Sequence, residues 1–355
     1  MKTLFNPYLT TIENTLKQSK LSKSFDSYSG LGSIPQNKKF MMTEGLDFPP
    51  GDQLAELARR AGAQPNGHGV VGMHPDFAYL RGTREFEYHN ITSTFIDIKG
   101  STNLYNRYNE EQIFVITNTI LSAAIHTCTV FGGHIQRLQG DGVFVYFGGK
   151  TIDENSAVLH ALLATATFTY FVKNDLKRVF ELNGIENIYT RIGIDIGKDD
   201  SEVLWVVTGT PTLNELTTIS LHTSLACKLQ SHAKSNGILV GENVFLRVLE
   251  IQKFFSHFTD DKTLEGKFHY KPYEFNWSEF LKSLPYLYVG LDGELDFIDQ
   301  PKKLLNSEEE RLNRLRDKML LVKTGDAYTD RNSVITNNPV GVKNQPHRFH
   351  FNDKI

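Results

Sequence analysis

The sequence predicts an α+β fold in which a βαββαβ core carries an added hairpin strand and helix, with N- and C-terminal extensions. Runs rich in valine, isoleucine, threonine and phenylalanine, which favour strands, alternate with apolar segments of helical length. Two of these runs flank an Asp-Gly turn, a strong short-range signal for a β-hairpin. With 355 residues and 40% hydrophobic content, the chain is long enough to bury a sizeable core.

Residues 1–85 are predicted to form a partly helical N-terminal extension. The segment Leu9–Lys17 is one candidate helix, and Asp52–Ala61 is a better one because Asp52 suits the N-cap position. Between and around them the chain is polar and contains many serine, lysine, glycine and proline residues. These residues are typical of loops.

Residues 86–250 show a regular alternation of strands and helices, and we expect them to form the core domain. The predicted elements are, in order, strand Ile91–Ile98, helix Glu110–Phe131, strands His134–Gln139 and Val143–Phe147, helix Asp153–Leu182, strands Tyr189–Ile196 and Glu202–Thr208, helix Thr217–Ala233 and strand Gly237–Val240. This order matches a ferredoxin-like core with extensions. In that topology the first and third core strands are neighbours.

Residues 251–324 are predicted to form a C-terminal extension that packs on the core. The segment Trp277–Leu284 reads as a short helix, and the charged segment Ser307–Val322 as a helix with a solvated face. Residues 325–355 are rich in asparagine, aspartate, threonine and proline, so we expect them to form a mobile tail.

Charge and hydropathy restrict the possible partners. The net charge of −3 lacks the basic excess of a non-specific nucleic-acid binder, so no nucleic-acid partner is expected. The most apolar windows, Ile113–Val130 and Ala157–Val172, are interrupted by polar residues, which favours buried helices over membrane spans. The two cysteines, Cys128 and Cys227, are predicted to be small buried hydrophobic residues. We expect a cytoplasmic protein.

The first core strand ends in a carboxylate. Phe95 and Asp97 share one face of this strand because side chains alternate. An unpaired buried charge is costly, and a bound cation would remove that cost. The following turn consists of Lys99, Gly100, Ser101 and Thr102. Its backbone N–H groups and hydroxyls, at the start of a predicted helix, are suited to hold phosphate.

A second carboxylate, Asp141, lies in the Asp-Gly turn after the first helix. Because the first and third core strands are neighbours, Asp97 and Asp141 can meet at one edge of the sheet. Two divalent cations, about 4 Å apart, would hold both carboxylates and polarise the attacking and leaving oxygens of a phosphoryl transfer. The alternative for Asp141 alone is a plain turn residue.

Four segments resemble those of the class III nucleotidyl cyclases, in that family's order and spacing. They are Phe95-Ile96-Asp97-Ile98-Lys99-Gly100-Ser101-Thr102, Arg137-Leu138-Gln139-Gly140-Asp141-Gly142-Val143, Arg191-Ile192-Gly193-Ile194-Asp195-Ile196-Gly197 and Ser224-Leu225-Ala226-Cys227-Lys228-Leu229. The resemblance implies a catalytic domain that works as a head-to-tail homodimer with shared active sites. It implies conversion of a nucleoside triphosphate to a 3′,5′-cyclic monophosphate and pyrophosphate. It also implies that Asp97, Asp141 and the Ile98 carbonyl hold two divalent cations, Mn²⁺ or Mg²⁺.

The sequence departs from the family's pattern at the residues that recognise the base, orient the ribose and stabilise the transition state. Arg137 stands where the family has the lysine or glutamate that reads a purine, and Thr217 stands at the position of its partner. Ser224 replaces an asparagine that orients the ribose, and Lys228 replaces an arginine that stabilises the α-phosphate. Lys228 keeps the positive charge but loses the bidentate fork. Ser224 and Lys228, four residues apart, share one helix face.

With these replacements, the sequence resembles the pyrimidine cyclases of Pycsar anti-phage systems. The resemblance implies a small-base pocket filled by Arg137 and Phe95, although Phe95 could equally be a core residue and Arg137 a surface charge. It favours CTP as substrate, cyclic CMP as a second messenger for anti-phage defence, and a downstream cyclic-nucleotide-binding effector. The residues open to nucleotide binding are Phe95, Lys99, Gly100, Ser101, Thr102, Arg137 and Thr217, with Lys228 and Ser224 as catalytic residues.

Three alternatives stay open at this point. Arg137 can donate to the O2 oxygen of either pyrimidine, so a uridylate cyclase that makes cyclic UMP is the first alternative. The second is an adenylate or guanylate cyclase with unusual base contacts. The third is a catalytically degenerate binding module, which the changes at Ser224 and Lys228 favour and the two retained aspartates oppose. Arg191, at the start of a strand, is interpreted as an ion-pair residue.

Overall fold

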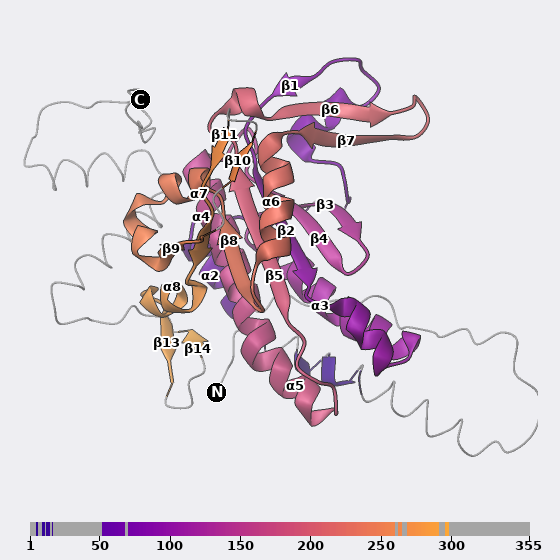
Figure 1. Cartoon of the computed structure of the whole chain (residues 1–355), viewed down its shortest axis with the longest axis vertical. Coiled ribbons are helices and arrows are strands. Elements are labelled where there is room, and N and C mark those ends of the chain that lie inside the picture. The colour runs from indigo at the N-terminus through magenta and orange to yellow at the C-terminus, as the bar shows by residue number, and fades with distance from the viewer. Residues whose placement is uncertain are drawn as a thin grey trace, which may run out of the picture.

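The computed structural model describes residues 52–67, 70–259, 262–264, 268–290 and 295–297, together with residues 5, 9, 10, 12–14 and 16 (Figure 1). Residues 9, 10, 12–14 and 16 are helical, as predicted for that segment. The predicted helix Ser307–Val322 and the predicted tail 325–355 lie outside the described residues.

A seven-stranded sheet, in the order β3-β4-β2-β5-β8-β12-β9, forms the centre of the fold. The predicted βαββαβ core supplies four of these strands: β2 (Thr92–Ile98), β3 (His134–Gln139), β4 (Gly142–Phe147) and β5 (Thr190–Ile196). The predicted neighbours, β2 and β4, pair antiparallel, so this part of the topology is confirmed. Strand β8 (Gly237–Val240) then pairs parallel with β5, and β12 (Tyr273–Phe275) and β9 (Phe255–His257) extend the sheet.

The helices cover the two faces of this sheet. Helices α3 (Glu110–Val130) and α4 (Glu154–Phe171) pack on one face, and α6 (Leu221–His232) lies across β5 and β2 on the other (Figure 1). Each begins at a polar cap: Asn109 forms a capping box with Gln112, and the side chains of Asp153 and Ser220 accept backbone N–H bonds. The sequence therefore sets where each helix begins.

The long helix predicted over 153–182 contains one wide turn. Helix α4 passes into a π-helical turn, Val172–Leu176, and continues as α5 (Lys177–Leu182). Such turns insert a residue without ending the helix. Asn183 follows as the C-cap, in agreement with the predicted end.

The helix predicted over 217–233 was wrong in its first part. Residues Asn214–Ile219 form strand β7, which pairs antiparallel with β6 (Leu204–Gly209). With β1 (Glu87–Tyr88) they make a small second sheet, ordered β1-β6-β7. Thr217, Thr218 and Ile219 are β-branched, which favours the pleated surface. Ser220 then caps α6.

The other elements complete the described chain. They are helices α2 (Asp52–Arg60), α7 (Glu242–Arg247) and α8 (Trp277–Ser283), strands β10 (Lys262–Leu264), β11 (Phe268–Tyr270), β13 (Leu287–Val289) and β14 (Leu295–Phe297), and 3-10 helices Pro75–Leu80, Ser101–Asn106, Asp200–Glu202 and Leu249–Phe254. Helices α2 and α8 confirm two predicted elements. Helix α8 packs against α4.

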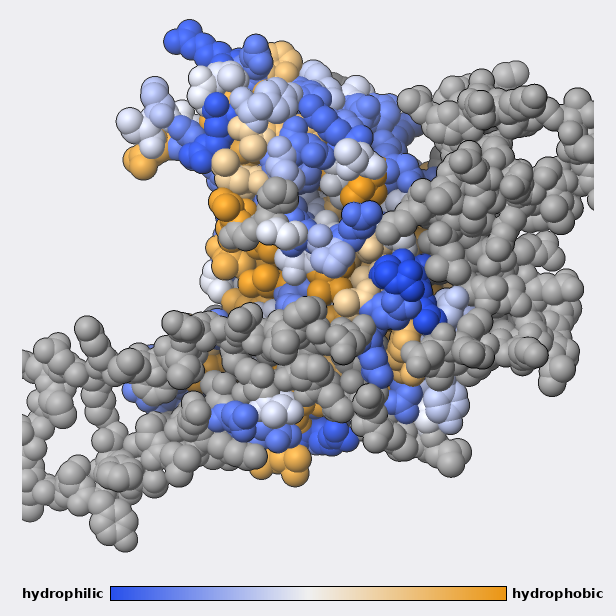
Figure 2. All heavy atoms as spheres, turned by 180° about the vertical axis from the view of Figure 1, so that it is seen from behind, coloured by the Kyte–Doolittle hydropathy of each residue, from blue (hydrophilic) through white to orange (hydrophobic). Residues whose placement is uncertain are grey.

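Two apolar helices form the interior layer. Glu110–Val130 and Glu154–Leu182 are long and apolar enough to cross a membrane, but 56% and 89% of their most apolar windows are buried inside the protein. Their apolar faces therefore serve the core of this fold. Cys128 on α3 is buried as predicted, whereas Cys227 on α6 is exposed, which corrects the prediction for that residue. Seen from behind, the described surface mixes hydrophilic side chains with groups of hydrophobic ones (Figure 2).

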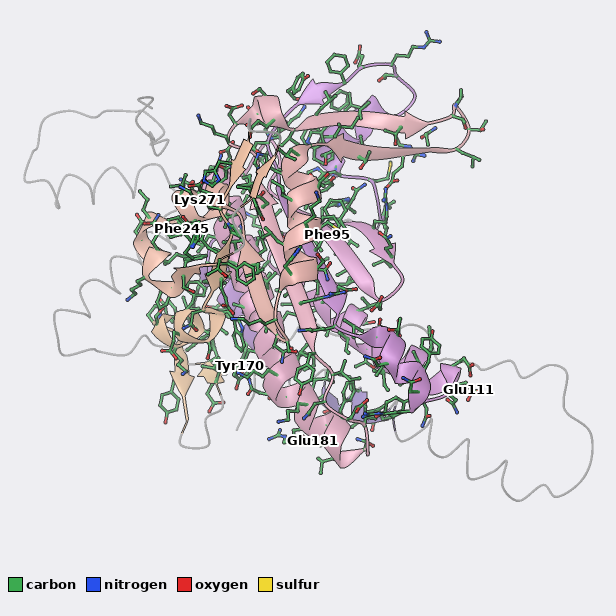
Figure 3. All side chains as sticks on the ribbon, in the orientation of Figure 1. Phe95, Glu111, Tyr170, Glu181, Phe245 and Lys271 are labelled. Atoms are coloured by element: carbon green, nitrogen blue, oxygen red, sulfur yellow. The ribbon has the colours of Figure 1, made fainter. Side chains whose placement is uncertain are left out.

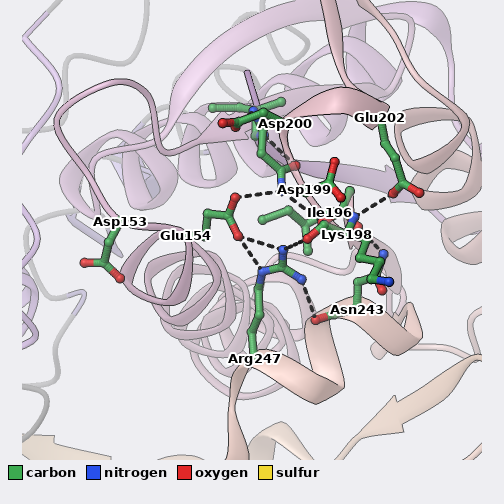
Figure 4. Close-up of polar contacts among 12 residues, drawn as sticks. Asp153, Glu154, Ile196, Lys198, Asp199, Asp200, Glu202, Asn243 and Arg247 are labelled. Atoms are coloured by element: carbon green, nitrogen blue, oxygen red, sulfur yellow. Dashed lines mark hydrogen bonds and ion pairs between the residues drawn. The ribbon is translucent and has the colours of Figure 1, made fainter. Parts of the chain in front are cut away.

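An ion-pair cluster ties α7 to the start of α4 and to the turn after β5 (Figure 4). The guanidinium of Arg247 donates to a Glu154 carboxylate oxygen, at 3.0 Å from Nε and 2.7 Å from Nη2. It also donates to the Lys198 carbonyl oxygen at 2.7 Å. Asn90 Nδ2 donates to the other Glu154 carboxylate oxygen at 2.9 Å. These bonds fix the end of β5 against the helical layer.

Candidate active site

The carboxylate of Asp97 lies on the α6 side of β2 and is paired. Arg191, directly opposite on β5, donates to Asp97 Oδ2 at 2.8 Å from Nε, and its Nη2 lies at 2.7 Å. Gln230 of α6 donates to the same oxygen at 2.9 Å. The prediction that Asp97 is unpaired was therefore wrong, because the cross-strand register brings Arg191 to it. The interpretation of Arg191 as an ion-pair residue is confirmed.

Asp141 occupies the turn of the β3–β4 hairpin, next to Gly142, which pairs directly with Asp97 across β4 and β2. Burial raises the pKa of Asp97, and the negative charge of Asp141 raises it further, against the hydrogen bonds from Arg191 and Gln230. The two predicted carboxylates are thus close enough to repel each other.

The pair fits divalent cations by its chemistry. The two hydrogen bonds to Asp97, from Arg191 Nε and Gln230, and the ion-pair contact of Arg191 Nη2 all reach Oδ2, whereas Oδ1 lies beside Gly142, where an added Cβ would be 3.4 Å from it. Hard carboxylate oxygens of this kind suit Mg²⁺ and Mn²⁺. In the part of the chain that is described, no group of three or more histidine, cysteine or acidic residues could hold a metal instead.

The turn after β2 differs from its predicted form. Gly100 has a left-handed backbone with φ of 72°, and Ser101–Asn106 form a 3-10 helix, while α3 begins only at Glu110. The Lys99 N–H donates to the Tyr189 carbonyl oxygen at 2.8 Å, so that N–H is already used. Gly100, Ser101 and Thr102 follow the Ile98 carbonyl at the end of β2. Any phosphate cradle here would depend on these three residues.

A row of side chains crosses the sheet two residues before Asp97 on β2, about 7 Å away along that strand. Arg137 on β3 is opposite Phe144 on β4, which is opposite Phe95 on β2. The Phe95 and Phe144 rings stack with centroids 4.1 Å apart. Phe95, labelled in Figure 3, lies between α6 and the β3–β4 hairpin. It is partly buried, so it serves packing and still borders the site.

Thr217 reaches the same region through Tyr146. Burial raises the pKa of Tyr146 to about 12, against hydrogen bonds with the hydroxyls of Thr218 and Thr217. The Tyr146 hydroxyl lies 2.7 Å from Thr218 Oγ1, and the positive charge of Arg137 also acts on it. Arg137 and Thr217, which the sequence pattern related, therefore lie around one phenol.

Glu215 is the residue of this region that sequence reasoning missed. Arg137 Nε donates to Glu215 Oε1 at 2.9 Å, and Nη2 pairs with Oε2. Residues 209–216 carry no predicted element, so the side chain of Glu215 has no predicted direction. The alternation of Glu215 and Thr217 with the buried Leu216 was the available strand signal.

Ser224 and Lys228 do not meet Asp97 within one chain. Helix α6 turns Leu225 and Leu229 toward the interior, while Ser224 and Lys228 are exposed on the opposite side. The helix lies so close to β5 that a Cβ added to Gly193 would be 2.1 Å from the Ala226 carbonyl oxygen. This close packing keeps Leu225 and Leu229 on the sheet side and Lys228 on the exposed side.

A buried ion pair anchors the start of α6. His222 Nδ1 lies 3.0 Å from Asp195 Oδ2 on β5, and its Nε2 lies 2.9 Å from Glu202 Oε2. Burial alone would lower the pKa of His222, but the hydrogen bond and charge of Asp195, with Glu202, outweigh it and raise that pKa. Burial also raises the pKa of Asp195. These two contacts of His222 tie the start of the helix that carries Ser224 and Lys228 to Asp195 on β5 and to Glu202.

Because of the His222–Asp195 pair, we expect the free energy of unfolding to depend on pH. Because the pKa of His222 is raised on folding, its contribution is complete below about pH 6.5 and is lost as the pH rises through the folded value. The raised pKa of Asp195 acts in the same direction. The unfolding free energy should fall with rising pH, by at most about 1.4 kcal/mol per pH unit for one proton.

Denaturant unfolding between pH 6 and pH 9 would measure this slope. His222→Gln should flatten the curve, and His232→Gln, on an exposed histidine of the same helix, should follow the unmodified protein. A His222→Gln curve that keeps the full slope would contradict the assignment to this pair.

Known proteins are similar to this chain over its core. Residues 84–276 match the family described as adenylate and guanylate cyclase catalytic domain. The chain is 39% identical over 229 residues to a cytidylate cyclase of Staphylococcus aureus, covering 61% of this chain and 53% of that protein. It is 29% identical over 232 residues to a cytidylate cyclase of Escherichia coli, covering 61% and 50%.

Among solved structures, the adenylyl cyclase CyaB from P. aeruginosa superposes with a TM-score of 0.47 at 21% identity, over 54% of this chain and 95% of that one. The chain spans about half the length of the curated relatives it matches. The family match covers more than half of the chain, including every strand that borders the two carboxylates. The chain therefore belongs to the adenylate and guanylate cyclase catalytic domain family.

Proposed function

We propose that this chain is a pyrimidine nucleotide cyclase that converts CTP to 3′,5′-cyclic CMP and pyrophosphate. The observation that carries the proposal is the Asp97–Asp141 carboxylate pair, with Arg137 on the same sheet face two residues away. Both curated relatives described above are named cytidylate cyclase, which supports cytosine as the base.

In the proposed reaction the ribose 3′-oxygen attacks the α-phosphorus. The bond from that phosphorus to the bridging oxygen breaks, pyrophosphate leaves with the electron pair, and the 3′-hydroxyl proton is released. Asp97, Asp141 and the Ile98 carbonyl would hold two divalent cations, Mn²⁺ or Mg²⁺, which supply charge neutralisation and activation of the 3′-hydroxyl when bound.

The chain's own side chains have separate proposed roles. The backbone and hydroxyls of Gly100, Ser101 and Thr102 would bind phosphate oxygens, with Lys99 adding charge. Lys228 would stabilise the charge that develops on the α-phosphate, and the Ser224 hydroxyl would orient the ribose. Phe95 would border the base, which Arg137 and Thr217 would contact.

The proposed assembly is a homodimer with shared sites. Lys228 and Ser224 lie on the outer side of α6, whereas Asp97 lies beneath that helix. A second copy placed head to tail could supply Lys228 and Ser224 to the carboxylates of the first. This dimer would act in the cytoplasm, where its nucleoside triphosphate substrate is available.

The cellular role is also part of the proposal. Cyclic CMP would serve as a second messenger in anti-phage defence and would act on a cyclic-nucleotide-binding effector. The support for this step is the sequence resemblance to the pyrimidine cyclases of Pycsar systems.

The test is a comparison of four nucleotides. The purified chain is incubated with Mn²⁺ and ATP, GTP, CTP or UTP, and products are identified by mass. Cyclic CMP should be the main product and should be lost in Asp141→Asn. A purine cyclic nucleotide as the only product would overturn the pyrimidine proposal.

One observation favours a second candidate, a cyclase-fold binding module. Arg191 and Gln230 already occupy one oxygen of Asp97. In the nucleotide comparison, such a module would yield no cyclic product with any of the four nucleotides, while nucleotide binding by calorimetry would persist.

A further inference from the structure

A buried polar side chain on α6 reaches the Asp97 carboxylate. Gln230 is only 7% exposed, and its Nε2 donates to Asp97 Oδ2 at 2.9 Å. A carboxylate only accepts hydrogen bonds, so the amide of Gln230 must present its nitrogen and not its oxygen. A polar group on the buried side of a helix is costly unless it is hydrogen-bonded. The contact with Asp97 therefore accounts for a glutamine at this place.

The position of Gln230 follows from the way in which α6 lies along β5. His222, Ala226 and Gln230 are four residues apart and form one stripe on the buried side of the helix. Four residues of helix rise roughly 6 Å and two residues of strand span roughly 6.6 Å, so the stripe stays in step with alternate residues of β5. His222 contacts Asp195, and Ala226 lies against Gly193. Gln230, the third member, is thereby brought to the end of the sheet where the two carboxylates lie.

The main chain of Gln230 is packed closely on the sheet. A Cβ added to Gly193 would lie 2.3 Å from the Gln230 backbone nitrogen. Near the start of the same helix, the Thr223 and Ser93 hydroxyl oxygens lie 2.9 Å apart, which links α6 to β2 as well. With the helix held in this way, the side chain of Gln230 keeps its amide at Asp97.

Two donors of different charge hold the Asp97 carboxylate. Arg191 from β5 and Gln230 from α6 both reach Oδ2. The χ2 torsion of an aspartate is broad by itself, and two donors from separate elements restrict it. Arg191 brings a positive charge that opposes a cation, whereas the amide of Gln230 is neutral. Gln230 can thus orient the carboxylate without repelling a cation bound to it.

We propose that Gln230 is a positioning residue that orients the Asp97 carboxylate for a divalent cation and ties it to α6. This inference rests on the proposed function, because it takes Asp97 as a cation ligand. Residues that hydrogen-bond a metal ligand fix its orientation before the metal binds. The helix that carries Ser224 and Lys228 on its exposed side would therefore also set the geometry of the cation site beneath it.

The test is Gln230→Met, which removes the amide but keeps the length of the side chain and a good helix former. Binding of Mn²⁺ to the full chain, without nucleotide, is measured by electron paramagnetic resonance. The dissociation constant for Mn²⁺ should rise by about 10- to 100-fold, as expected when a residue that orients a metal ligand is removed. A residue that only packed the helix would leave this constant unchanged in the folded variant.

The matched control is Gln252→Met. Gln252 also donates from Nε2 to an oxygen, the Phe245 carbonyl at 3.0 Å, but it lies in the 3-10 helix after α7. Its Mn²⁺ dissociation constant should equal that of the unmodified chain. In Gln230→Met, the Mn²⁺ concentration for half-maximal cyclic CMP production should rise with the dissociation constant, and excess Mn²⁺ should restore most of the rate.

A measurement on the unmodified chain needs no variant. In a crystal structure with Mn²⁺ bound, Gln230 Nε2 should stay within about 3.2 Å of an Asp97 carboxylate oxygen. An amide turned away from the carboxylate in that state would contradict the proposal, whether or not Gln230→Met folds.

The outcomes separate this inference from the proposed function. An unchanged Mn²⁺ dissociation constant in folded Gln230→Met, with cyclic CMP still formed by the unmodified chain, would overturn the role of Gln230 alone. Mn²⁺ binding that weakens in Gln230→Met, in a chain that forms no cyclic nucleotide, would support the role of Gln230 and overturn the proposed function. Absence of Mn²⁺ binding by the unmodified chain would overturn both.

Discussion

Asp97→Asn should lower the rate of CTP cyclisation by about 10³-fold or more while leaving the fold intact. Asparagine has the shape of aspartate but removes the charge that would hold a divalent cation beside Asp141. The fold should tolerate the change because the side-chain oxygen of asparagine can still accept hydrogen bonds from Arg191 and Gln230. The melting temperature should stay within about 4 °C of the unmodified chain.

Three measurements check this prediction: cyclic CMP by mass, Mn²⁺ binding by electron paramagnetic resonance, and thermal unfolding. Binding of Mn²⁺ should weaken in Asp97→Asn. The control is Asp153→Asn, which makes the same chemical change at the N-cap of α4, where asparagine caps as well as aspartate. Near-normal turnover in Asp97→Asn would overturn the assignment of Asp97 to the cation.

The carboxylate pair could be predicted from sequence because it depends on topology alone. A βαββαβ order makes the first and third core strands neighbours, and that adjacency brings the end of β2 to the β3–β4 turn. The pairing of Asp97 with Arg191 depends instead on the register between β2 and β5. A shift by one residue would place Arg191 on the other face. Register between strands distant in sequence is not visible in the composition of either strand.

The segment around Thr217 shows a second limit. Its strand is short, and its apolar helix begins after a single residue, Ser220. A short β-branched run before a helix can be read as the helix's first turn, as the predicted helix from Thr217 shows, and Glu215 lies just before that range. Residues 214–219 form a strand because they pair with β6, and such a contact between two segments is not visible in either segment alone.

Helix α6 shows what the structure adds for Ser224 and Lys228, which are catalytic residues only by prediction. The spacing of Ser224 and Lys228 predicted that they share one helix face. It could not predict which face lies on the sheet. The absence of a side chain at Gly193 allows the close approach of Ala226, and Leu225 and Leu229 turn inward. The outward position of Lys228 follows from that packing.

Mixing two inactive variants should therefore restore activity if the sites are shared. Asp97→Asn and Lys228→Ala each inactivate both sites of a homodimer with shared sites. In a mixed dimer, one site combines the intact Asp97 of one copy with the intact Lys228 of the other. With random pairing, about half of the dimers are mixed and each has one of two sites intact, so about a quarter of the unmodified activity should return.

The measurement is cyclic CMP production by the mixture after subunit exchange, with native mass spectrometry of differently tagged chains to show mixed dimers. The matched control mixes Asp97→Asn with Asp141→Asn. Both of these changes affect the same half of a site, so every site in every dimer stays inactive and no activity should return. If mixed dimers of Asp97→Asn and Lys228→Ala form and remain inactive, Lys228 does not complete the site of the other copy.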